Sequence, residues 1–106
     1  MSSYQVDRLK WSKMSIIEQM GNIYSEVGRS FNANRSNDIK QRDEAVTRAL
    51  DLFDATVEGL ISQNSPRSKE VLRSKDQFLQ VIYGDLDEVG VDRYFLQYAI
   101  AARKNT

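Results

Sequence analysis

The sequence predicts an all-α protein, an antiparallel up-down-up-down four-helix bundle that follows a short N-terminal arm. Apolar residues recur at helical spacing over four long segments, and the connections between these segments are short. One proline and five glycines in 106 residues leave few interruptions for helices. The length fits one domain, residues 15–106, after an arm of residues 1–14. A three-helix bundle with a fourth docked element is the main alternative topology.

The arm, residues 1–14, is expected to be irregular or to contain one turn of helix. Its apolar side chains, Tyr4, Val6, Leu9 and Trp11, are spaced so that the arm can pack across the domain.

The first long helix is predicted over residues 15–34. Ser15 and Glu18 match a capping box, in which each side chain satisfies a free backbone donor at the helix start. Gly21 and Gly28 lie on the flank of the apolar arc and cost up to about 1 kcal/mol each relative to alanine. Close approach of a neighbouring helix is the simplest compensation for that cost.

The second helix is predicted over residues 38–62, with Asn37 or Asp38 as its cap. Its apolar arc covers about half of the circumference, which is typical of a helix with neighbours on two sides. Leu52 lies on the second side of this arc.

The third helix is predicted over residues 66–83. Ser65 is its expected cap, and Pro66 suits the first helical position because no hydrogen bond is lost there. Gly84 is expected to end the helix in the left-handed conformation. Lys75 projects from the apolar arc, which leaves three interpretations: a side chain that reaches water, a pair with Asp54 or Glu26, or an amine with a lowered pKa.

The fourth helix is predicted over residues 92–103 and is apolar on nearly every side. Leu96 and Ile100 point away from Phe95 and Tyr98, so a monomeric bundle leaves them exposed. Exposed apolar patches commonly mark interaction sites. We therefore expect a homo-oligomer or a protein partner to cover a surface that includes Leu52, Leu96 and Ile100.

Composition excludes several classes of chemistry. The chain has no cysteine and no histidine, which removes thiolate chemistry, the commonest general base and the commonest metal ligand. Fifteen basic residues balance fifteen acidic ones, so there is no global attraction to nucleic acid or to an anionic membrane. No apolar run is long enough to span a membrane, and the N-terminus lacks the apolar core of a signal peptide. We expect a cytoplasmic protein with no enzymatic activity and no cofactor.

An acidic connection offers the strongest metal-site motif. Asp85, Asp87 and Gly90 match the opening of a calcium-binding EF-hand loop, but Val89 and Leu96 occupy later positions that require oxygen ligands. A carboxylate-bridged di-metal bundle needs inward-facing Glu-x-x-His pairs, which a chain without histidine lacks. No metal site is predicted.

Basic residues define two further hypotheses. Arg67, Lys69 and Arg73 make the start of the third helix basic, and a nucleic-acid-binding accessory protein would use them. A binder of small anions or nucleotides, with its pocket between subunits, would use Lys75 or Arg103. The alternative interpretation is that these basic residues belong to an ordinary charged surface.

Three stretches carry a resemblance to a known group: GNIYSEVGR, RALDLFDAT and YFLQYAIAAR. Together they resemble small bacterial proteins described only as uncharacterised four-helix-bundle proteins, over residues 11–103. More distantly, the chain is similar to the accessory bundles of diversity-generating reverse transcriptases. The resemblance implies a helical bundle and no defined activity; the distant one implies an oligomer that binds nucleic acid and a polymerase.

Overall fold

The computed structural model describes residues 5–104, and this part of the chain contains helices and turns but no strand. The all-α class is therefore confirmed. The helices are α1 (Arg8–Ser12), α2 (Ile16–Arg35), α3 (Ile39–Ser62), α4 (Arg67–Tyr83) and α5 (Glu88–Lys104).

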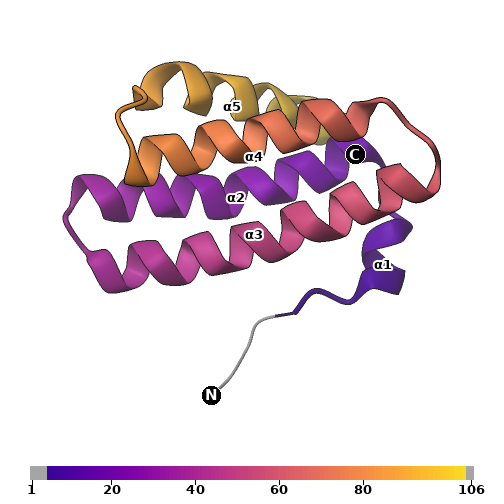
Figure 1. The fold of residues 1–106 in the computed structure, drawn as a ribbon, viewed down its shortest axis with the longest axis horizontal. Coiled ribbons are helices and arrows are strands. Elements are labelled where there is room, and N and C mark those ends of the chain that lie inside the picture. Colours follow the sequence, from indigo (N-terminus) through magenta and orange to yellow (C-terminus); the bar gives the residue numbers. More distant parts are fainter. Residues whose placement is uncertain (1–4, 105–106) are drawn as a thin grey trace.

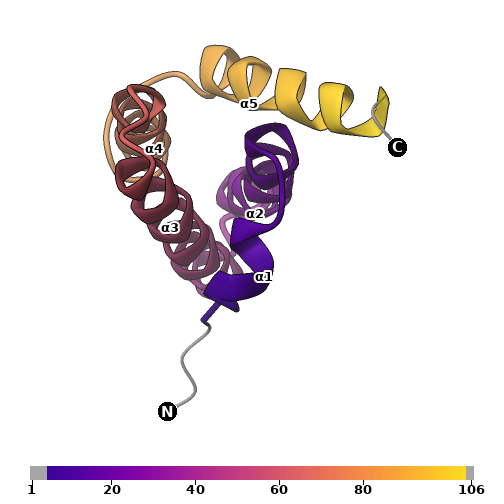
Figure 2. The ribbon, with the colours of Figure 1, turned by 90° about the vertical axis from the view of Figure 1, so that its right-hand side faces the viewer.

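The long helices differ in how they are aligned. α2, α3 and α4 lie side by side, and each runs opposite to the one before it (Figure 1). α5 crosses obliquely above α2 and extends past it, as the end view shows (Figure 2). It packs closely along α2 and touches α4 much less. A regular up-down-up-down bundle is therefore not confirmed, and the arrangement matches three antiparallel helices with a fourth docked across them.

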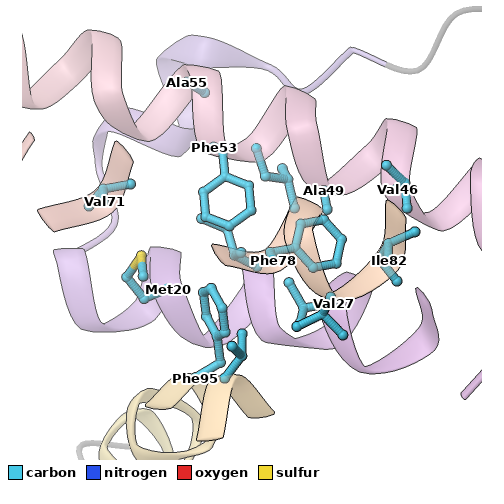
Figure 3. Packing of buried hydrophobic residues seen from close by; sticks show 14 of the residues in the cluster. Met20, Val27, Val46, Ala49, Phe53, Ala55, Val71, Phe78, Ile82 and Phe95 are labelled. Atoms are coloured by element: carbon cyan, nitrogen blue, oxygen red, sulfur yellow. The ribbon is translucent and has the colours of Figure 1, made fainter. Parts of the chain in front are cut away.

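A chain of phenylalanine rings forms the centre of the core (Figure 3). Phe53 on α3 lies 6.0 Å from Phe78 on α4 and 5.9 Å from Phe95 on α5, measured between ring centroids. Phe31 on α2 lies 5.8 Å from Phe78. Such tilted and edge-to-face pairs add about 0.5–1.5 kcal/mol each beyond their burial. One aromatic cluster thus joins all four long helices.

The second apolar side of α3 is buried within the chain. α3 contacts α2, α4 and α1, so three neighbours surround it. Leu52 is only 4% exposed and belongs to the core. The expectation that Leu52 contributes to a partner surface is therefore corrected: its neighbours are helices of the same chain.

The N-terminal arm contains a short helix, α1, which packs against α3. The buried Trp11 donates a hydrogen bond from Nε1 to Thr56 Oγ1, at 2.9 Å. Val6 packs against the core, whereas Leu9 is largely exposed. The expected contact of Tyr4 lies outside the described residues.

Asparagines, not glycines, supply the left-handed residues at the helix ends. Asn37 and Asn64 have φ of 57° and 54°, and each is the left-handed residue of a Schellman-type turn that the amide of the next residue closes. Gly84 has φ of −125°, so the predicted left-handed conformation is wrong. Glycine is needed there for space, since a Cβ atom would lie 2.9 Å from the Gln80 carbonyl oxygen.

Helix starts agree with the sequence in two cases and differ in two. Asp38, one of the two predicted caps of α3, accepts a hydrogen bond from the Gln41 amide at 3.1 Å. The capping box of Ser15 and Glu18 is present at the start of α2. α4 begins one residue after Pro66, which occupies the N-cap. α5 begins at Glu88, four residues before the predicted start, because the Asp87 carboxylate accepts the Val89 amide (3.2 Å) and stabilises an earlier first turn.

Every helix within residues 5–104 is either too short or too polar to cross a lipid bilayer.

Candidate functional site

The side of α5 that faces away from the core carries three exposed apolar residues. Val89, Leu96 and Ile100 are spaced by seven and four positions, which places them along one side of the helix. Their exposed fractions are 58%, 38% and 45%. Only Val91 and Phe95 on this helix are fully buried. The prediction that Leu96 and Ile100 are exposed in the monomer is confirmed.

We call Val89, Leu96 and Ile100 the apolar ridge. A stripe of small residues on α2, which includes Gly21, Ser25 and Gly28, runs beside it. Gly21 lies under α5, where a Cβ atom would be 3.3 Å from the Ala102 Cβ atom, so the predicted close approach of a helix is confirmed there. Gly28 has no neighbour within 4 Å of a Cβ position, so the same explanation fails for it. The stripe is therefore covered at one end and open at the other.

The ridge and the stripe enclose a shallow groove of 280 Å³. Its α2 wall consists of Tyr24, Ser25 and Gly28 with Gly21, and its α5 wall includes Leu96 and Ile100. We call the groove together with Val89 the α2–α5 face. Sequence reasoning missed Val89, because the predicted helix began at residue 92 and excluded it.

Polar contacts attach the N-terminal end of α5 to α2. Tyr24 donates a hydrogen bond to Asp92 at 2.9 Å, and Arg35 forms an ion pair with Glu88. Desolvation, followed by the hydrogen bond to Asp92, raises the pKa of the Tyr24 hydroxyl. These contacts lock the first turns of α5 onto α2.

Two tyrosines connect α5 to α4. The hydroxyls of Tyr94 and Tyr98 donate to the same Glu70 carboxylate oxygen, at 2.8 and 3.0 Å. Burial is the main cause that raises the pKa of each tyrosine above its usual value. Both hydroxyls therefore stay protonated at neutral pH, and the cluster acts as a structural link.

The basic residues proposed for nucleic-acid or anion contact do not converge. Arg73 lines a hollow beside Tyr94, whereas Arg67 lines a different cleft near α1. Lys69 is exposed on α4. Arg103 borders the α2–α5 groove. These positions do not support one continuous basic surface.

Lys75 adopts the second of its three predicted arrangements. Its Nζ lies 3.2 Å from Asp54 Oδ1, and both side chains are partly exposed. Exposed pairs of this kind contribute roughly 0–1 kcal/mol.

Glu26 is the buried acid of α2. Its carboxylate pairs with Arg29, three residues along the same helix, at 3.0 Å and with Arg48 of α3 at 3.1 Å. Two partners compensate the burial of this charge, so the group is a structural bridge between α2 and α3.

The acidic α4–α5 connection has no metal-binding arrangement within residues 5–104, where no three potential ligands gather. Asp87 caps α5 instead.

Comparison with protein-family models, curated proteins and solved structures finds no match to this chain. The α2–α5 face therefore has to be interpreted from its own geometry.

Proposed function

We propose that this protein is a non-enzymatic interaction module that associates with a second copy of itself through the α2–α5 face. One observation carries the proposal. An apolar ridge of Val89, Leu96 and Ile100 stands exposed beside an open groove that small residues line.

A second copy fits this face because the face contains both complementary shapes. In a two-fold dimer each copy presents the same surface, so a surface with both a ridge and a groove can pair with itself. Leu96 and Ile100 of one copy would enter the groove along Ser25 and Gly28 of the other. The open space at Gly28 leaves room for such a side chain.

Charge does not oppose this pairing. The whole chain has a formal net charge of zero, so two copies experience no net repulsion. Small residues at a helix interface also allow close approach of backbones.

The size of the apolar ridge predicts weak association. A half-exposed leucine-sized side chain gains about 1 kcal/mol from complete burial. Three such residues on each of two copies give a gain comparable with the lower end of the cost of association, about 4–15 kcal/mol. The dimer should therefore be weak and dissociate on dilution, with a Kd in the millimolar range.

Sedimentation velocity over a wide concentration range tests the proposal. The wild-type protein should shift from monomer to dimer as its concentration rises. The double variant Leu96→Glu/Ile100→Glu should remain monomeric, because dimerisation would bury four carboxylates. Its circular dichroism should match the wild type, since both side chains are already partly exposed.

A matched control places the same charges on another part of the surface. Ile61 and Leu72 are also exposed apolar residues, and neither lines the α2–α5 groove. The variant Ile61→Glu/Leu72→Glu should dimerise like the wild type. A wild-type protein that stays monomeric at millimolar concentration, or a control that dissociates equally, would overturn the proposal.

A further inference from the structure

A cleft of 490 Å³ lies at the end of the molecule where α1 meets the other helices. α1, the start of α2, the end of α3 and the α3–α4 turn each contribute to its walls. Small residues make room for it, among them Ser12, Ser15 and Gly59. A volume in this range is typical of sites for small molecules. No residue of this cleft also lines the α2–α5 groove.

Gln19 contributes a buried amide to the wall of this cleft. Gln19 is only 9% exposed, and its Nε2 donates to the carbonyl oxygens of Trp11 at 2.8 Å and Met14 at 3.4 Å. No group within residues 5–104 donates to its Oε1. That oxygen is nevertheless not sealed from solvent, because no fully buried side-chain oxygen in this part of the chain lacks a partner. Gln19 lines the cleft, so we assign its free acceptor to this site.

The charged residues that line the cleft are two arginines and one glutamate: Arg8, Arg67 and Glu58. Arg8 donates to Asp51 at 2.9 Å and to Glu58 at 3.3 Å, so acidic neighbours already compensate its charge. Arg67 also lines the cleft and forms no ion pair with the described residues. A guanidinium with five donors in a planar fork matches a carboxylate well.

We propose that this cleft binds a small organic carboxylate that also carries an amide or hydroxyl donor. The carboxylate would pair with Arg67, the donor would meet Gln19 Oε1, and the carbon atoms would contact Ile16 and Leu60. The buried acceptor and the cation therefore select for two groups on one ligand. This inference is independent of self-association.

Titration of the ¹⁵N-labelled protein with N-acetylglycine, followed by NMR, tests the proposal. N-acetylglycine has a carboxylate and an amide donor. We expect saturable shifts at the Gln19 side-chain amide and at the Gly59 backbone amide. Acetate, which has no donor, should bind about tenfold more weakly, as expected when one well-formed hydrogen bond is lost. Inorganic phosphate should not produce the same shifts at Gln19.

Two variants make the test specific. Gly59→Leu should fill the cleft and abolish binding, and it should fold normally because a Cβ atom at this position meets nothing within 4 Å. Gly28→Leu is the matched control, because Gly28 is equally open but lies on the α2–α5 face. Arg67→Gln should weaken binding about tenfold, since it removes a charge-assisted hydrogen bond.

Several results would overturn the proposal. Shifts that do not saturate would show that no site exists. Equal affinity for acetate and N-acetylglycine would remove the role of Gln19, and equal affinity for phosphate would leave a general anion site only. Unchanged binding in Gly59→Leu would place the ligand elsewhere. Loss of dimerisation leaves these expectations unchanged, so the two proposals fail separately.

Discussion

α3 and α5 are both apolar on more than one side, but the fold buries the second apolar side of α3 and leaves that of α5 exposed. α3 lies among α1, α2 and α4, and its second side is buried, with Leu52 4% exposed. α5 crosses the outside of α2, and its far side is open, with Leu96 38% and Ile100 45% exposed. Position within the fold, and not hydrophobicity, separates the two helices.

The contrast shows what a surplus of apolar residues does and does not indicate. A broad apolar arc indicates that a helix needs more than one neighbour. It does not reveal whether those neighbours belong to the same chain. For α3 the same chain supplies them, whereas for α5 we propose a second copy.

We expect the largest difference in unfolding free energy when one leucine on each of the two helices is replaced by alanine. Leu52→Ala should lower the free energy of unfolding by about 2–5 kcal/mol, because it leaves a cavity in the core. Leu96→Ala should cost less than about 1 kcal/mol, because its side chain is already partly hydrated. Urea unfolding at a concentration where the chain is monomeric measures both. Equal costs would show that α5 is as enclosed as α3.

A smaller effect tests the polar link between α5 and α4. The double variant Tyr94→Phe/Tyr98→Phe removes both hydrogen bonds to Glu70 and should cost about 1–2 kcal/mol at neutral pH. Urea unfolding measures this cost, and no loss of stability would show that the link does not hold α5 in place.

The same tyrosines predict a pH dependence. Their pKa values are raised above the usual 10.0, so the unfolded chain releases these protons at lower pH than the folded one. The contribution of these tyrosines to the free energy of unfolding is complete below the usual pKa of 10.0 and is lost as the pH rises further. The wild type should therefore lose stability above pH 10 more steeply than Tyr94→Phe/Tyr98→Phe. Tyr24 and Tyr83, whose pKa values are also raised, contribute to the slope that remains in the variant. Identical slopes in alkaline urea titrations would contradict this assignment.

The smallest effects compare two glycines of α2. Gly28→Ala should stabilise the monomer by about 0.5–1 kcal/mol, because alanine favours a helix and the site is open. Gly21→Ala should stabilise less or destabilise, because its Cβ atom would press on Ala102. Thermal unfolding in the Leu96→Glu/Ile100→Glu background separates stability from association. A larger gain at Gly21 than at Gly28 would show that α5 is not closely packed on α2.

Much of the local structure could be predicted from short-range patterns. The spacing of apolar residues located the four long helices, and the pair of Ser15 and Glu18 located the start of α2 to within a residue. The start of α5 was predicted four residues too late, because the residues before position 92 were interpreted as an acidic connection, whereas the Asp87 cap starts the helix at Glu88. The cleft at α1 was not foreseen, because Gln19 and Arg67 are far apart in sequence and only the fold brings them together.

The sequence by itself determined the helical class, the approximate helix bounds and the sides of each helix that avoid water, because these depend on neighbours within a few residues. It also determined that α3 and α5 each carry more apolar surface than one contact can cover. Only the tertiary structure decided that Leu52 is core while Leu96 and Ile100 remain at the surface. The crossing of α5 over α2 decides this, and it depends on close approach at Gly21 and on the aromatic cluster around Phe53, contacts between residues that are distant in the chain.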